Sequence, residues 1–186
     1  SAPPTAYQAA LAGLFGLDAC THTSFANGNG AHLTVSLFQR GVCAAVDAAV
    51  DAYTARATAL DTLARALEAW VPGLKLPTGT TAWVHVKQND KDGHWLDVSK
   101  TRYTKLKAAL AKGDAAKVAA FQATTQGLWS LNELEFDTKN KTNVKISGPG
   151  IRSHSQALQA AQQALATAVR TEYARQLQRL HQAHYG

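Results

Sequence analysis

The chain has 186 residues, a length typical of one domain that buries a core of its own. Hydrophobic residues make up 46% and charged residues 17%, and no run of 18 apolar residues predicts a membrane span. The net charge of +6 is uneven: residues 1–70 carry three basic and five acidic side chains, and residues 71–186 carry sixteen and eight. The simplest interpretation of this basicity is a solvated surface, and the functional alternative is a polyanionic partner.

The first part of the chain predicts a short helix, a loop and a long helix. Thr5 can cap a helix that ends near Gly16, and residues 18–31 are turn-formers and small polar residues. Residues 42–70 have apolar side chains every three or four positions, which predicts an amphipathic helix. The preceding residues 32–38 alternate as a strand would, but no breaker except Gly41 separates them from the helix. We therefore expect one long helix over about 33–70, bent at Gly41.

The middle of the chain mixes strand and helix signals. Residues 80–87 alternate apolar and polar side chains, which predicts a strand, and a turn and a second short extended segment follow. Ser99 and Asp114 are expected N-caps of two shorter helices, and residues 131–147 suggest a β-hairpin.

The breaker Gly148-Pro149-Gly150 precedes a last periodic segment, which predicts a second long helix over about 154–184 with Ser153 or Ser155 as its cap. The expected fold is mainly α: a single domain, 1–186, in which a helical bundle on two long helices carries shorter helices and a small β-hairpin cap.

Two cysteines, Cys20 and Cys43, belong to no metal or redox motif. They fit one disulfide that ties the loop to the long helix, or two unrelated thiols. The amino-terminal residues 1–8 lack the features of a signal peptide and suit either a processed, exported chain or a cytosolic one. Export is slightly favoured because the cysteines could then pair.

An enzymatic hypothesis makes Cys20 the nucleophile of a small hydrolase. A thiol nucleophile needs a nearby histidine base, and His22 in the sequence or His85 on the predicted strand could supply it. No hydrolase signature surrounds these residues, so a structural cysteine beside a surface histidine is the simpler interpretation.

Metal and cofactor motifs are not found in the sequence. His181 and His184 are three positions apart on the last helix, but a zinc site needs three or four ligands. No glycine-rich phosphate loop is present. We therefore predict no metal and no cofactor.

Basic residues offer the best candidate binding surface. They lie on the predicted helix after Ser99 and on the hairpin, with Trp95 and Tyr103 nearby, and phosphates could bind such a field while aromatic rings stack bases. The predicted contact residues are Lys100, Arg102, Lys105, Lys107, Lys112, Lys139, Lys141 and Lys145.

The sequence thus favours a non-enzymatic interaction or assembly protein over the cysteine hydrolase. Its expected partners are another protein, a further copy of the chain, or a polyanion such as nucleic acid or an envelope polymer.

Overall fold

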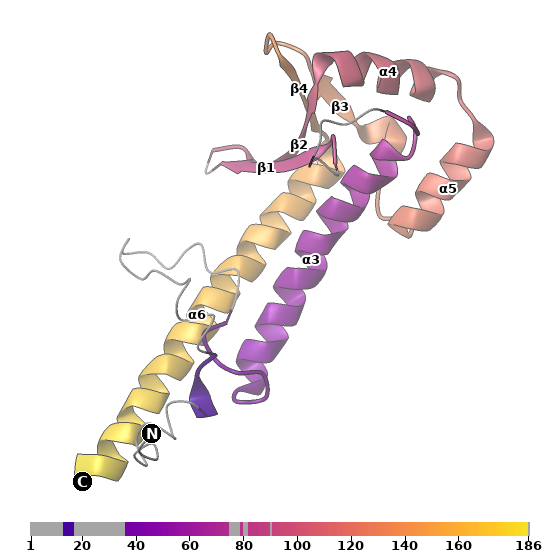
Figure 1. Cartoon of the computed structure of the whole chain (residues 1–186). Helices are drawn as coiled ribbons and strands as arrows, with labels where there is room; N and C mark the ends of the chain where they lie inside the picture. The colour runs from indigo at the N-terminus through magenta and orange to yellow at the C-terminus, as the bar shows by residue number, and fades with distance from the viewer. Residues whose placement is uncertain (1–12, 17–35, 75–78, 80–81, 90, 186) are drawn as a thin grey trace. The chain divides into compact units, whose positions relative to one another are not determined.

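A computed structural model describes residues 13–16, 36–74, 79, 82–89 and 91–185 of the chain (Figure 1). Among these residues, the helices are α3 (Ala44–Glu68), α4 (Lys100–Ala111), α5 (Ala115–Thr125) and α6 (Pro149–Tyr185). The strands are β1 (His85–Asn89), β2 (Gly93–Ser99), β3 (Glu135–Asp137) and β4 (Asn143–Ser147). The fold is mainly α, as predicted, and it also contains a small antiparallel sheet. None of the helices is both long enough and apolar enough, over the residues described, to cross a membrane.

The chain divides into two compact units. Unit 1 comprises Ser1–Ala55 and Leu158–Gly186, and unit 2 comprises Arg56–Ala157. The two boundaries fall inside α3 and inside α6, so each long helix contributes residues to both units. The two units are described separately below.

Unit 1 is held together by an apolar cluster on its helical segments. The buried members come from the segment before α3, from α3 and from α6, and are Leu37, Phe38, Val46, Leu165, Ala166 and Val169. The Phe15 ring stacks on Phe38 with 5.3 Å between centroids, and the two residues also form an isolated β-bridge. Burying apolar side chains from three segments stabilises their packing through the hydrophobic effect.

The prediction of one helix from residue 33 is wrong over residues 36–43. These residues form a bridge and turns, and α3 begins only at Ala44. Gly41 has a φ of +91°, a left-handed conformation that ends regular structure instead of bending a helix. Its backbone N–H donates to the Asp47 carboxylate at 2.8 Å. Of the alternating segment, the described residues 36–38 contain one isolated β-bridge, between Phe38 and Phe15, and no helix.

Unit 2 contains a four-stranded antiparallel sheet of order β1-β2-β4-β3. Directly paired residues share a face, and Leu96 lies opposite both Val86 and Ile146. We call this side the apolar face; the fully buried Val98 and Val144 also lie on it. The opposite side, the polar face, carries Trp95, Asp97 and Ser99 of β2 and their register partners.

Helices α4 and α6 both reach the apolar face. The ring of Tyr103 in α4 lies 5.2 Å from that of Phe136 in β3, and Ser155 in α6 bonds to His94 in β2. Before β1, the Glu68 carboxylate at the end of α3 accepts the backbone N–H groups of Trp83 and Val84. The sheet was predicted only as a hairpin and separate extended segments, because strand order depends on contacts distant in sequence.

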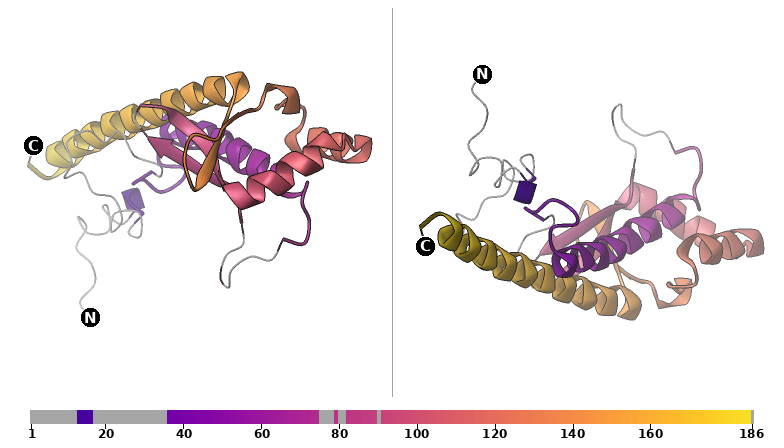
Figure 2. Two further views of the ribbon diagram at one scale, coloured as in Figure 1. Left: turned by 90° about the horizontal axis from the view of Figure 1, so that it is seen from above. Right: turned by 90° about the horizontal axis from the view of Figure 1, so that it is seen from below.

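Helix α5 lies beyond the carboxyl-terminal end of α4 and away from the sheet in every view (Figures 1 and 2). The predicted cap Asp114 is confirmed, since its carboxylate accepts the N–H groups of Ala116 and Lys117. Ser99 stands at the N-cap of α4, but its side chain makes no capping hydrogen bond. Exposed alanines cover much of α5, with Val118 at 38% exposure.

The last helix begins five residues earlier than predicted. Pro149 opens α6, where its fixed φ and its missing N–H suit the first turn. Ser155, a predicted cap, is instead buried within the helix. Gly148 has a φ of +152°, and a Cβ there would lie 2.2 Å from the backbone oxygen of Glu133. Only glycine permits this close approach between the residues before α6 and those before β3.

Candidate polyanion-binding surface

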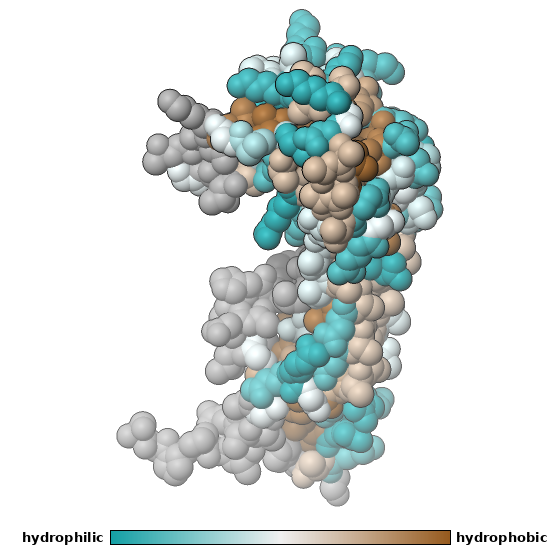
Figure 3. Space-filling model, turned by 90° about the vertical axis from the view of Figure 1, so that its right-hand side faces the viewer, coloured by the Kyte–Doolittle hydropathy of each residue, from teal (hydrophilic) through white to brown (hydrophobic). Residues whose placement is uncertain are grey.

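Helix α4 carries a dense group of cations. Lys100, Arg102, Lys105 and Lys107 lie on it, and no acidic residue occurs between positions 98 and 113. Lys100, Lys105 and Lys107 are exposed, and Arg102 is half-buried. Figure 3 shows hydrophilic side chains gathered at the top of the view, the level at which Figure 1 places α4. The helix therefore presents a strongly positive surface to solvent.

The buried Leu106 fixes which side of α4 faces the protein. At about 100° per residue, Lys105 and Lys112 share one exposed ridge, and Lys100 and Lys107 share another. All four lysines are exposed, so both ridges face solvent.

The first turn of α4 places its cations where they oppose helix stability. The amino end of a helix carries a partial positive charge, which favours acids and disfavours bases. Here Lys100 and Arg102 occupy that end without any acidic neighbour in the turn, and Ser99 supplies no side-chain cap. The stability of α4 itself does not explain these cations.

A groove opens beside this turn. It is lined by Gly73 and Leu74 after α3, and by Ser99, Thr101, Arg102 and Lys105, and its volume is about 540 Å³. Hydroxyl and cationic groups on one wall are hydrogen-bond donors that suit phosphate, sulfate or carboxylate oxygens.

The β3–β4 turn carries Lys139 and Lys141, both exposed. The Asp137 carboxylate accepts the Lys139 N–H at 3.0 Å, and the Asn140 side chain accepts the Thr142 N–H at 3.0 Å. These local bonds give the turn a defined backbone. The two lysine side chains extend from it and form no ion pair with any described residue.

Lys145 differs from the other predicted cations because it is engaged twice. Its Nζ lies 3.1 Å from the Asp92 carboxylate and 4.6 Å from the centroid of the Trp95 ring. The hydrogen bond to Lys145, together with one to Asn89, lowers the pKa of Asp92. Lys145 is therefore partly neutralised, and it marks where the basic residues meet the polar face of the sheet.

Of the two cysteines predicted to pair, the structure describes Cys43. Cys43 is half-buried and forms no disulfide with any described residue, and Cys20 lies outside the described residues, so their disulfide stays a prediction. His22 also lies outside them, and His85 is exposed on β1. Counting thiols in the denatured, unreduced chain tests both ideas, because a bonded pair excludes Cys20 as a nucleophile.

Unit 1 contains a buried polar cluster that the sequence did not reveal. Glu172, 4% exposed, accepts two bonds from the Arg175 guanidinium, at 2.7 and 2.8 Å, and one from the Gln176 amide. Arg175 chiefly, with Gln176 and the Cys43 thiol, lowers the Glu172 pKa to about 2. The i, i+3 and i, i+4 spacing of these residues is visible in the sequence, and helical periodicity places either Glu172 or Tyr173 on the buried side, but the hydrogen bonds among the three residues are not visible.

A second missed cluster joins β2 to α6 in unit 2. The Ser155 hydroxyl accepts the His94 backbone N–H at 2.7 Å and lies 3.1 Å from the His94 Nδ1. Burial, and then the charge of nearby His154, lower the His94 pKa. His154 Nε2 donates to the Arg56 carbonyl at 2.8 Å. These contacts link α3, β2 and α6. The bonded residues are separated by 61 and by 98 positions in the chain, so no local pattern in the sequence indicates them.

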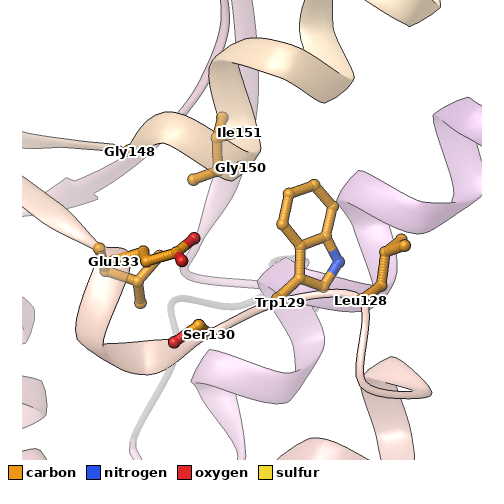
Figure 4. Close-up of a pocket in the computed structure, with 8 residues that line it drawn as sticks. Leu128, Trp129, Ser130, Glu133, Gly148, Gly150 and Ile151 are labelled. Atoms are coloured by element: carbon orange, nitrogen blue, oxygen red, sulfur yellow. The ribbon is translucent and has the colours of Figure 1, made fainter.

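Trp129 closes a small cavity at the start of α6 (Figure 4). Its indole lies against Gly150 and Ile151, with Glu133 on the far side of Gly150. The cavity measures about 10 Å³, room for one water molecule at most. The Trp129 Nε1 is buried and has no hydrogen-bond partner among the described residues. The site is too small for a substrate and serves packing.

A metal centre does not emerge from the described residues, which contain no group of three histidine, cysteine or acidic side chains placed to hold an ion. His181 is exposed, and the His184 side chain lies outside the described part of the chain. The basic residues on α4 and the β3–β4 turn therefore form the strongest candidate site. Comparison with protein-family models and with curated proteins finds no match, so the site must be interpreted from its own chemistry.

Proposed function

We propose that this is a non-enzymatic interaction protein whose unit 2 binds a polyanion, such as nucleic acid or an anionic envelope polymer. The contact surface is the basic surface: Lys100, Arg102, Lys105, Lys107, Lys112, Lys139, Lys141 and Lys145. The two long helices act as a helical-bundle scaffold in this proposal and take no part in the contact.

The observation that carries the proposal is that the cations of the basic surface are in excess and almost all lack an ion pair among the described residues. Ion pairs join Lys145 to Asp92, Lys87 to Asp97 and Arg152 to Glu135. Seven of the eight cations of the basic surface form no ion pair with any described residue. Unpaired, exposed cations contribute a field that attracts a polyanion and releases its counterions on binding.

Binding to heparin and to DNA tests this proposal across a range of salt concentrations. The double variant Lys105→Glu with Lys107→Glu should weaken binding to both by tenfold or more at low salt. It should also flatten the salt dependence, because every phosphate that the protein stops neutralising lowers the slope of log K against log salt by about 0.9 on duplex DNA.

A matched control reverses two exposed cations outside the basic surface, Arg56→Glu with Arg179→Glu. It changes the net charge equally and should leave most of the affinity. Equal reductions in affinity in the two double variants would mean that net charge alone drives binding. Absence of salt-dependent binding to either polymer would overturn the proposal. The native mass in the same samples separates a lone domain from an assembly.

A further inference from the structure

The polar face of the sheet carries cations and a tryptophan that the basic surface does not fully include. Register pairing puts Lys87 of β1 directly opposite Trp95 of β2, and puts Lys145 of β4 opposite Asp97. Lys87 and the neighbouring His85 are exposed, and Trp95 is half-buried. An indole between cationic strands is the arrangement in which single-stranded nucleic acids are bound by sheet platforms.

The contact between Lys145 and Trp95 shows how the indole is presented. The ammonium lies over the ring at 4.6 Å from its centroid, so a polar side chain, and not core packing, covers that ring face. The lysine head is also held by the exposed turn residue Asp92. Because this contact lies at the surface, a nucleobase could stack on the Trp95 ring in place of the Lys145 ammonium. Lys145 could then bind the adjoining phosphate.

Asp97, the acid of this face on β2, does not repel a phosphate backbone strongly. Asp97 is 9% exposed and is bonded by Lys87 at 3.0 Å and by the Asn143 amide at 2.7 Å. Its charge is therefore compensated within the sheet.

Two further acids lie on this face, on β3: Glu135, opposite Ser147, and Asp137, opposite Lys145. Glu135 is paired with Arg152, and Asp92 beside the face is paired with Lys145. Asp137 accepts the Lys139 N–H and forms no ion pair with any described residue, so it is the carboxylate on this face whose charge is least compensated.

The polar face leads directly into the groove beside α4. Trp95, Asp97 and Ser99 follow one another along the same side of β2, and Ser99 lines the groove with Arg102 and Lys105. Four residues of strand span about 13 Å. A few unpaired nucleotides could thus stack one base on Trp95. The phosphates that follow this base would then lie between Arg102 and Lys105.

We infer that the polyanion is single-stranded nucleic acid, bound along β2 with an unpaired base stacked on Trp95. This inference rests on the proposed function and names its ligand. A duplex keeps its bases paired and inside the helix, so it would reach the cations but not the indole. An anionic polysaccharide has no aromatic base to stack.

Tryptophan fluorescence gives a specific readout for this contact. The other three tryptophans, Trp70, Trp83 and Trp129, are only 3–4% exposed, so a stacking ligand should quench Trp95 alone. Titration with an oligothymidine of about 15 nucleotides, a length that covers one sheet platform, should quench part of the emission, whereas heparin at saturation should not. In Trp95→Phe the quenching should disappear while oligonucleotide binding persists.

Affinity measurements complete the test. Trp95→Ala should weaken oligothymidine binding by about tenfold or more and leave heparin affinity within twofold, and Trp95→Phe should retain most of the affinity for both. Thermal unfolding of both variants checks that they are folded; should Trp95→Ala not fold, loss of quenching in Trp95→Phe decides.

The failures of the two proposals are distinguishable. Salt-sensitive binding of heparin and duplex as tight as that of oligothymidine, without quenching, would overturn the single-strand inference and leave the basic surface intact. Absence of binding to all three polymers would overturn both.

Discussion

Unit 1 and unit 2 differ in charge as clearly as in architecture. Unit 1 carries four basic and four acidic residues, whereas unit 2 carries fifteen basic and nine acidic, so the whole net charge of +6 belongs to unit 2. Unit 1 packs helical segments around an apolar cluster, and unit 2 adds a sheet with one polar face. Unit 1 uses its most buried charge, Glu172, for internal bonds, while in unit 2 seven of the eight cations of the basic surface form no ion pair with a described residue. Function should therefore be sought in unit 2.

The largest expected change in stability, and one confined to unit 2, comes from a substitution at Gly148. Gly148→Ala should destabilise this unit by about 3 kcal/mol or more, because its Cβ would lie 2.2 Å from the Glu133 carbonyl oxygen. Tryptophan fluorescence in urea measures this change, since all four tryptophans lie in unit 2. The control Gly150→Ala meets side-chain atoms only at 3.7 Å and should change stability little. Equal effects of the two variants would contradict the argument.

The buried charge of unit 1 gives the next largest effect. Glu172→Gln should destabilise unit 1 by about 2 kcal/mol at neutral pH, because Arg175 and the polar groups around it are left without a charged acceptor. Hydrogen exchange along residues 158–183 is the measurement, since unit 1 contains no tryptophan. The control Asp51→Asn removes the exposed pair with Arg40 and should have almost no effect.

Lowering the pH should destabilise unit 1 through the ion pair between Glu172 and Arg175. The Glu172 pKa in the folded chain is about 2, below its ordinary value of 4.5. The stabilisation is therefore complete above about pH 4.5 and is lost as pH falls toward 2. Glu172→Gln should lack this part of the acid dependence, and an unchanged pH profile of exchange would contradict the assignment.

The link between β2 and α6 predicts a smaller effect in unit 2. Ser155→Ala leaves the buried His94 N–H without its acceptor and should cost about 1–2 kcal/mol by tryptophan fluorescence in urea. Ser153→Ala, two residues away and exposed, is the matched control and should be nearly neutral.

The same link should make unit 2 sensitive to mild acid. The folded-state pKa of His94 is lowered below 6.5 by burial and by His154, so the neutral ring is the one that the fold accommodates. Stability should fall as pH drops below about 6.5, in a range where the Glu172 pair of unit 1 stays ionised. His94→Gln should remove this response while leaving the response of unit 1 at lower pH.

The smallest expected effect concerns the first turn of α4. Lys100→Glu should stabilise unit 2 by about 0.3–1 kcal/mol, because an acid at the amino end of a helix is favourable. The same change should weaken polyanion binding severalfold. Stability and binding would then move in opposite directions, whereas a merely solvated lysine predicts no change in binding.

Local signals predicted much of this molecule. Asp114 was identifiable as a cap, since an acidic side chain directly before a helical segment accepts nearby N–H groups. The core of the long helix and the β3–β4 hairpin were visible from side-chain periodicity and turn residues. The basic surface was likewise readable, because lysines are exposed in most folds.

Contacts distant in sequence account for what was missed. Two predicted helix starts, at residue 33 and at residue 154, were wrong. Gly41 and Gly148 adopt positive φ angles fixed by their surroundings, and regular helix begins only after each of them. The pairing of β2 with β4, and the bond between His94 and Ser155, join residues about 45 to 60 positions apart. No window of sequence contains both partners of such a contact.

By itself, the sequence determined that the chain is mainly helical and where its positive charge lies, because periodicity and charge are properties of neighbouring residues. Only the tertiary structure decided that Trp95 and Lys145 meet on one face of a sheet, that Ser99 opens into a groove with Arg102 and Lys105, and that Glu172 is buried with its partners. Strand register and burial arise only when segments distant in sequence pack together. That packing places the basic residues beside a groove and an aromatic ring.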